Sequence, residues 1–309
     1  MLGGDRGIGV SDVLHESVPD VVLVGFALLT QLGDVWFLFL AGGVLYVAGE
    51  AVPRWGLDRQ RGLFVLGLLL TYVALIGVLK QYFLFPRPPG AGDPPVVPWI
   101  PSLFQVVFAD ITTAEGPGFP SGHALGTTMV WGGFALVVGE DGLSRAWLGL
   151  AGGVVALVSL SRLFLGVHYF VDVVVGIGLG AVVLGVLYVV TDRGTDPARV
   201  LLVAVAIGAV GVLQEVSFDS VAAVGSAVGA WVVWRGVAGA TPAQPSNRWE
   251  AGVGFAVFGL AGGLFAFLYA VEPPPVLTFV GSIIAVSGAV GAPLVGATLI
   301  EWSDGRSPS

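Results

Sequence analysis

Residues 61–80 read RGLFVLGLLLTYVALIGVLK, and this stretch decides the class of the fold. Between its first and last residues it carries no charge. A helix of about 20 residues, rising about 1.5 Å per residue, is long enough to cross the hydrocarbon core of a bilayer. The stretch ends on Lys80, the only lysine of the chain. We therefore expect a membrane-spanning helix with a cation at its end.

The rest of the chain has the composition of an integral membrane protein. Of its 309 residues, 55% are hydrophobic and only 11% are charged, and the mean hydropathy is +0.90. A soluble domain usually carries about 25% charged residues. We predict an all-α fold, a polytopic transmembrane helical bundle with about nine spans. They are expected at about 35–50, 61–80, 122–139, 145–162, 168–190, 198–214, 219–237, 250–270 and 276–300.

The first apolar segment is short for a span. Residues 19–32 (PDVVLVGFALLTQL) fall below the roughly 20 residues that a spanning helix needs, so we predict an interfacial helix that breaks at Gly33-Asp34. Alternatively, residues 19–50 form one bent element. The N-terminal 20 residues have no basic start and no apolar run, unlike a signal peptide. The first helix is therefore expected to act as its own insertion signal.

Three regions and two long connections follow from this pattern. Residues 1–34 form an N-terminal segment with the interfacial helix, 35–190 a core, and 191–309 additional C-terminal transmembrane helices. Residues 86–119 are rich in proline and glycine, which break helices, and a long loop of this kind beside a site is usually a lid or a binding element. Residues 238–249 read as a polar linker.

Charge and cysteine content exclude several classes of protein and site. The chain has no cysteine, so disulfides and thiolate metal sites are excluded. Its net charge of -8 argues against a nucleic-acid partner, which would need a basic surface. There is one lysine among 13 basic residues, and the balance is acidic. Both features favour a halophile, a hypothesis that full activity in dilute buffer would contradict.

The basic residues also predict an orientation. If the loops are numbered alternately, one side collects most of the arginines, and the other holds only Arg6, Lys80, Arg87 and Arg162. By the positive-inside rule the arginine-rich side is cytoplasmic. We expect a multi-pass protein of the cell membrane, with the four listed cations on its extracytoplasmic face.

Reactive side chains gather in three short stretches of the core. The first runs from Lys80 to Arg87-Pro88, the second is Pro120-Ser121-Gly122-His123, and the third is Ser161-Arg162, His168 and Asp172. On the predicted spans, Lys80, His123, Arg162 and His168 all lie at helix ends on one face of the membrane. Ionisable groups are costly near hydrocarbon, so their presence indicates a functional site.

These groups suit phosphate chemistry. Phosphoryl transfer needs cations around the oxygens, a nucleophile in line with the leaving oxygen and a proton for that oxygen. The arginine and lysine side chains supply cations, and the helix start at Ser121 and Gly122 offers free backbone amides to an anion. Asp172 is four residues after His168 and can fix its tautomer for attack on phosphorus. His123 can then protonate the departing alkoxide.

Each residue taken alone has an ordinary structural interpretation. Lys80 can be a lysine that snorkels from a helix end, Ser121 an N-cap, and His168 an interfacial histidine. The three stretches together, at these spacings and on one face, favour the site.

The three stretches resemble the three signature motifs of the type-2 phosphatidic acid phosphatase family, the membrane branch of the superfamily that includes vanadium haloperoxidases. The motifs are Lys80-x6-Arg87-Pro88, Pro120-Ser121-Gly122-His123 and Ser161-Arg162-x5-His168-x3-Asp172, and no signature position departs from them. The resemblance covers roughly residues 19–190. It implies a helical bundle with an outward-facing site. The resemblance further implies lipid phosphate hydrolysis that needs neither a metal nor another cofactor.

The resemblance also implies roles for single residues. His168 would be the nucleophile, Asp172 its partner and His123 the acid. Phosphate would be bound by Lys80, Arg87, Ser121, Gly122 and Arg162. Members of the family commonly have six spans, so the residues beyond about 198 exceed that plan.

The function expected from the sequence is an integral-membrane lipid phosphate phosphatase that works through a phosphohistidine intermediate. Its substrates would be phosphatidic acid-like lipids or polyprenyl phosphates and diphosphates, and its partners the lipid bilayer and this substrate. One alternative is a phosphotransferase that passes the phosphoryl group to a sugar or alcohol. Another is a non-catalytic transporter of anionic lipid, which is disfavoured because it gives no reason for a nucleophile and a proton donor together. The oligomeric state stays open.

Overall fold

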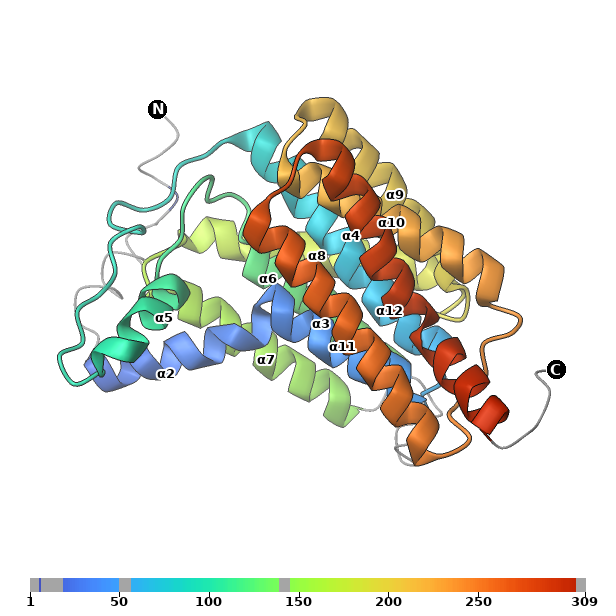
Figure 1. Cartoon of the computed structure of the whole chain (residues 1–309). Helices are drawn as coiled ribbons and strands as arrows, with labels where there is room; N and C mark the ends of the chain where they lie inside the picture. The colour runs from blue at the N-terminus through green and yellow to red at the C-terminus, as the bar shows by residue number, and fades with distance from the viewer. Residues whose placement is uncertain (1–5, 7–18, 50–56, 139–144, 304–309) are drawn as a thin grey trace.

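The computed structural model of the protein describes residue 6 and residues 19–49, 57–138 and 145–303. Over these residues it is helical, without strands. The helices are α2 (Asp20–Thr30), η1 (Gln31–Gly33), α3 (Val35–Ala48), α4 (Arg59–Phe83), α5 (Ser102–Thr112), α6 (Gly122–Val137), α7 (Arg145–Phe164), α8 (Phe170–Val190), α9 (Pro197–Gln214), α10 (Phe218–Val237), α11 (Arg248–Val271) and α12 (Pro275–Ser303). Most of them run side by side as one bundle (Figure 1). The predicted all-helical class is thus confirmed. The prediction that the N-terminal 20 residues are not a signal peptide concerns residues that lie largely outside the described ranges.

Seven of the described helices are long and apolar enough to cross a membrane: α4, α7, α8, α9, α10, α11 and α12. The segment from α2 to α3 counts as an eighth if this pair, bent by 49°, is one span. The expected count of about nine stays a prediction, because α3 has 14 residues and α6 has 16, fewer than the roughly 20 that a perpendicular span needs.

The bend between α2 and α3 lies where the sequence predicts a break. Asp34 caps α3, because its side chain accepts a hydrogen bond from the backbone N–H of Trp36. The indole Nε1 of Trp131 in α6 donates to the carbonyl of Leu32 at 2.9 Å, which ties the bend to the bundle. Gly33 is needed here, since a methyl group on it would lie 2.4 Å from Oγ1 of Thr127.

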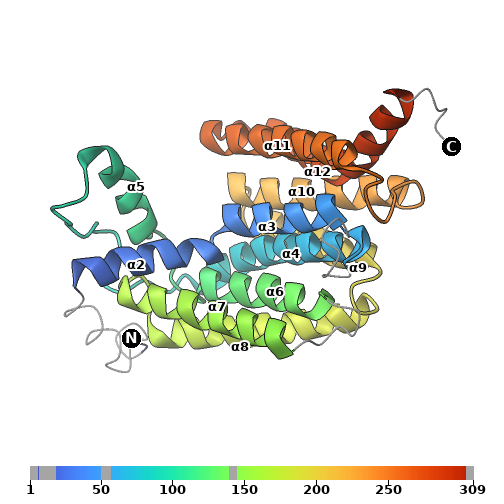
Figure 2. The same cartoon turned by 90° about the horizontal axis from the view of Figure 1, so that it is seen from below.

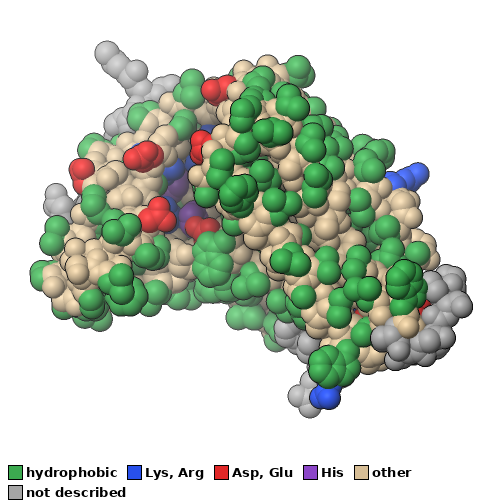
Figure 3. Space-filling model, in the orientation of Figure 1, with side chains coloured by type: hydrophobic (Ala, Val, Ile, Leu, Met, Phe, Trp, Pro, Cys, Tyr) green, Lys and Arg blue, Asp and Glu red, His purple; other side chains and the backbone are tan. Residues whose placement is uncertain are grey.

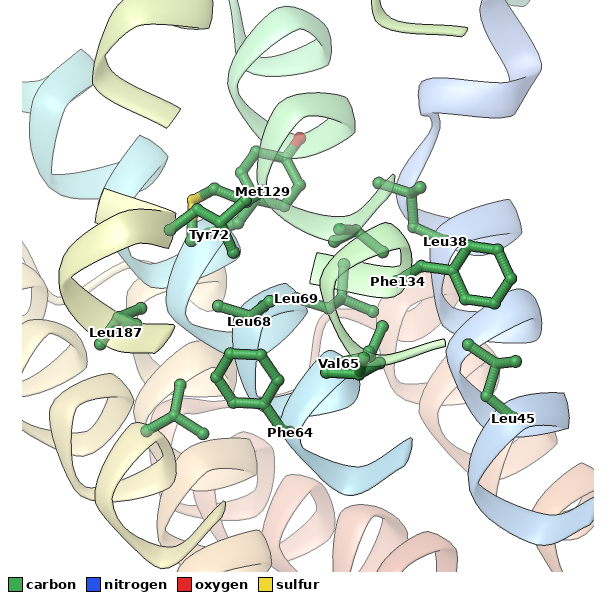
Figure 4. Packing of buried hydrophobic residues seen from close by; sticks show 14 of the residues in the cluster. Leu38, Leu45, Phe64, Val65, Leu68, Leu69, Tyr72, Met129, Phe134 and Leu187 are labelled. Carbon is green, nitrogen blue, oxygen red and sulfur yellow. The ribbon is translucent and has the colours of Figure 1, made fainter. Parts of the chain in front are cut away.

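Helix α4 is the centre of the bundle. Of its apolar window 61% is buried inside the protein, against 22% for α11. One face of α4 packs into a cluster with α3, α6 and α8, in which Phe64, Leu68 and Tyr72 meet Met129 and Leu187 (Figure 4). The helix that carries Lys80 is therefore held on several sides by buried apolar contacts.

The C-terminal helices pack on the same central helix. In Figure 2, α11 and α12 lie at one side of the molecule, α7 and α8 at the opposite side, and α3 and α4 between them. A second buried cluster joins Tyr46 of α3 and Leu63 of α4 to Leu201, Trp234 and Phe258 of α9, α10 and α11. Residues after 197 thus share a continuous apolar core with the helices that precede them.

A buried ion pair strengthens this junction. The Arg59 guanidinium at the start of α4 lies 3.2 Å from Oε1 of Glu250 in α11, and the two side chains are 1% and 2% exposed. Arg59 also donates to the carbonyls of Val47 and Pro242, while Oε2 of Glu250 accepts from the backbone N–H and the hydroxyl of Ser246. Both charges are therefore compensated by several hydrogen bonds.

The long connection predicted at residues 86–119 contains one helix, α5. Its Leu103, Phe104, Val106 and Val107 are all more than half exposed. Figure 1 shows α5 beside α2, at the end of the bundle where α4 ends. An apolar helix exposed in this way has the surface of a segment that can lie at a membrane interface.

Candidate active site

Histidine and cationic side chains lie in a hollow of the surface, with carboxylates around it (Figure 3). The hollow is at the end of the bundle where α4 and α7 end and where α6 and α8 begin. Helix ends present unpaired backbone groups, and the connections between them are free to carry polar side chains. The three sequence motifs occupy these connections and helix ends.

His168 lies in the turn between α7 and α8 and is only 2% exposed. Its Nε2 is 3.1 Å from a terminal nitrogen of Arg87, and its Nδ1 is 3.6 Å from Oδ2 of Asp172. An arginine can only donate, so Nε2 accepts and the ring proton is on Nδ1, facing the carboxylate. This tautomer leaves the Nε2 lone pair on the side of the cations, which is the side that a phosphate would occupy.

The environment of His168 favours its neutral form. Burial, followed by the positive charges of Arg87, Arg162 and Lys80, lowers the pKa of His168 well below its usual range. A neutral imidazole is the form that can attack phosphorus. The site therefore keeps this imidazole neutral at neutral pH.

Asp172 is fully buried near the start of α8 and is held from two directions. Its Oδ2 accepts from the backbone N–H of Tyr169 at 3.0 Å, and its Oδ1 accepts from Arg6 at 2.8 Å. The Arg6 guanidinium also stacks on the rings of Phe85 and Tyr169 and donates to the carbonyl of Pro86. Because Arg6 occupies Oδ1, the other oxygen is left facing His168.

Arg87 joins the long loop to the third motif. Its Nε donates to the carbonyls of Glu115 and Gly116, and its terminal nitrogen donates to the carbonyl of Val167 at 2.9 Å. Burial lowers the pKa of Arg87, an effect that the negative charge of Asp172 opposes. One arginine side chain thus holds both ends of the loop against the turn that carries His168.

The second motif forms the N-terminus of α6. Ser121 is fully buried and its hydroxyl caps the helix by accepting from the N–H of Ala124, while its backbone N–H donates to the carbonyl of Asp172 at 2.9 Å. Close approach of α8 makes this contact possible, since a methyl group on Gly176 would lie only 2.7 Å from the Ser121 carbonyl. The second and third motifs are therefore joined through their backbones, and Ser121 serves first as a helix cap.

His123 follows in the first turn of α6, close enough to His168 to interact electrostatically with it. Its Nε2 is 3.8 Å from Oδ2 of Asp34 at the bend between α2 and α3. Lys80, Arg87 and Arg162 all lie within electrostatic range of this imidazole. The side chain is 22% exposed, so part of the imidazole is open to the surface.

Arg162 is buried at the end of α7, with 4% of its surface exposed. One terminal nitrogen donates to Oγ1 of Thr30 at 3.0 Å. Its Nε is buried and has no hydrogen-bond partner among the described residues. A buried donor of this kind can take up an oxygen of a bound anion.

The structure therefore brings the predicted site residues to one place. Hydrogen bonds or close contacts connect Arg87, His168 and Asp172, while His123 and Arg162 meet the α2–α3 bend. Lys80 acts on both histidines through its charge. Ser121 and Gly122 are buried at the helix start.

Sequence reasoning missed three contributors to the site. They are Arg6, Thr30 and Asp34, which contact Asp172, Arg162 and His123 respectively. Asp34 was visible in the sequence only as part of a helix break, and Arg6 only as one of few basic residues on its side. Neither signal connects them to a partner more than 80 positions away.

Comparison with known proteins gives one result. Residues 61–196 match the family model described as the PAP2 superfamily. Searches of curated proteins and of solved structures gave no significant match. The matched range contains all three motifs and ends just before α9. The resemblance inferred from the motifs is thus confirmed over residues 61–196, the part of the chain that the PAP2 superfamily model matches.

Proposed function

We propose that this protein is an integral-membrane, metal-independent lipid phosphate phosphatase that works through a phosphohistidine at the extracytoplasmic face. Substrates of the expected kind are phosphatidic acid-like lipids and polyprenyl phosphates or diphosphates. The PAP2 superfamily match and the apolar helices support a membrane phosphatase. The observation that carries the finer proposal is the position of His168, between Arg87 on Nε2 and Asp172 on Nδ1.

In the first step of the proposed mechanism, Nε2 of His168 attacks phosphorus. The N–P bond forms as the bond from phosphorus to the lipid oxygen breaks, and His123 gives its proton to that oxygen. Asp172 stabilises the positive charge that develops on His168. Arg87, Arg162 and Lys80 offset the negative charge of the equatorial oxygens.

In the second step, water replaces His168 on phosphorus. His123 is now neutral and takes a proton from the water, so that the N–P bond breaks and inorganic phosphate leaves. The two histidines therefore return to their starting protonation states. No step consumes a reagent other than the lipid phosphate and water.

The test of the proposal is phosphate release by the purified protein in detergent and high salt, with EDTA present. The substrates are phosphatidic acid, a polyprenyl diphosphate and a soluble phosphate ester, and His168→Ala protein serves as the blank. We expect release from at least one lipid substrate, unaffected by EDTA. Loss of all release on adding EDTA would contradict metal independence. Release that needs an added alcohol acceptor would identify a transferase instead.

The pKa of His168 predicts the pH dependence of this reaction. Because the pKa is lowered, the imidazole takes up a proton only below the usual histidine value of about 6.5. The acidic limb of kcat/KM is therefore expected below pH of about 6.5. Removing one positive charge with Arg87→Gln should move this limb to higher pH. A limb that stays in place in the variant reports titration of the substrate and would contradict the assignment to His168.

A further inference from the structure

The α2–α3 bend contacts the site through three neighbouring positions. Thr30 accepts a hydrogen bond from Arg162 at 3.0 Å, and the carbonyl of Leu32 accepts from Trp131 at 2.9 Å. Gly33 lies so close to α6 and α7 that a methyl group on it would be 2.4 Å from Thr127 and 2.6 Å from Val158. The next residue, Asp34, is consequently held in a defined position against the first turn of α6.

The two carboxylate oxygens of Asp34 face different partners. Oδ1 accepts from the backbone N–H of Trp36 at 3.3 Å and so caps α3. Oδ2 is 3.8 Å from Nε2 of His123, a buried nitrogen that has no hydrogen-bond partner among the described residues. The helix cap uses one oxygen and leaves the other directed at the imidazole.

The surroundings of His123 otherwise oppose a positive charge on it. Lys80 from α4, Arg87 from the loop and Arg162 from α7 all act on this ring, and His168 lies close enough to interact electrostatically with it. A general acid must carry its proton before the leaving group departs. Among the described ion pairs of His123, the partner is Asp34. Its negative charge offsets the nearby cations.

We propose that Asp34 is a positioning residue that holds His123 as the protonated acid of the reaction. This inference rests on the proposed function and adds to it a second histidine–carboxylate pair, Asp34 with His123, opposite His168 with Asp172. As the bond between phosphorus and the leaving oxygen breaks, the proton passes from His123 to that oxygen. Asp34 itself keeps its charge throughout and does not touch the substrate.

The Asp34→Asn variant separates this role from capping. Asparagine caps helices about as well as aspartate, so α3 keeps its N-terminal hydrogen bond while the charge is lost. Asp34→Glu keeps the charge and serves as the conservative variant. Asp110→Asn is the matched control, because it removes an exposed carboxylate on α5 that acts on Asp34 only through its charge.

The readout is the dependence of kcat/KM on the leaving group, because kcat/KM excludes the later hydrolysis step that both substrates share. Dodecyl phosphate needs a proton for its alkoxide, whereas a nitrophenyl phosphate with an alkyl chain of similar length releases a stable phenolate. For Asp34→Asn we expect kcat/KM to fall roughly 10- to 100-fold on the alkyl substrate and less than about threefold on the aryl substrate. Asp34→Glu should recover part of the loss, and Asp110→Asn should behave as wild type on both.

If the Asp34 substitution instead weakened phosphate binding, the two substrates would show a different pattern of rates. Asp34 also lies within electrostatic range of Arg162, so a disturbed phosphate site or a disturbed bend would lower the rates of both substrates together. Equal losses on the two substrates, or none, would overturn the proposal. Failure of the proposed function is recognised separately, because wild-type rates on both substrates would then equal those of His168→Ala.

Discussion

Alanine in place of His168 is expected to lower turnover of every phosphate substrate by at least about 10⁴-fold while the protein stays folded. The nucleophile cannot be replaced by a neighbour, because Asp172 is fully buried and engaged with Arg6 and Tyr169. In the proposed mechanism His123 is the proton donor, so it does not attack phosphorus. Phosphate release under saturating substrate measures the loss.

The control for this prediction is the same substitution at His15, the remaining histidine of the chain. His15→Ala removes an imidazole from the polar N-terminal sequence and should keep wild-type turnover. Equal elution volume and equal melting temperature in detergent would show that both variants are folded. Unchanged turnover in folded His168→Ala protein would remove the phosphohistidine mechanism.

Loss of the buried ion pair between α4 and α11 should give the largest change in stability. Leucine in place of Glu250 leaves the Arg59 guanidinium, which is 1% exposed, without its carboxylate. An uncompensated buried charge costs about 3–5 kcal/mol. We expect a clear drop in melting temperature in detergent, because Arg59 and Glu250 connect the start of α4 to α11.

A double variant tests the cause of that loss. Arg59→Met combined with Glu250→Leu removes both charges and keeps apolar volume, so its stability should return close to that of the wild type. Asp196→Asn is the matched control, since its pair with Arg199 is exposed and is worth at most about 1 kcal/mol. If the double variant were as unstable as Glu250→Leu, the loss would come from packing or from the contacts to Ser246.

The C-terminal helices show what hydropathy alone can predict and what it cannot. Their apolar stretches predict their number and approximate bounds, because a spanning helix depends mainly on length and composition. Nothing in those stretches indicates that Leu201, Trp234 and Phe258 share a core with Tyr46 and Leu63. An apolar side chain that faces lipid and one that faces another helix look alike in sequence, so only packing separates them.

The sequence by itself determined the membrane class and the resemblance to the PAP2 superfamily, and it supplied the candidate site residues. Spans are read from composition, and the motif residues are recognised by type and spacing along the chain. The spacing also indicated that His168 and Asp172 are neighbours, although the structure places His168 in the turn before α8 rather than in the helix. Local spacing is reliable here because a carboxylate and an imidazole four residues apart at a helix start cannot be far apart in space.

Only the tertiary structure decided which groups accompany the two histidines. Arg6 meets Asp172 across 166 positions, and Thr30 meets Arg162 across 132. Asp34 reaches His123 because Gly33 allows the α2–α3 bend to approach α6 and α7 closely. Such pairs depend on how closely and at what angle helices pack. That geometry is set by many contacts at once, so no pattern along the chain records it.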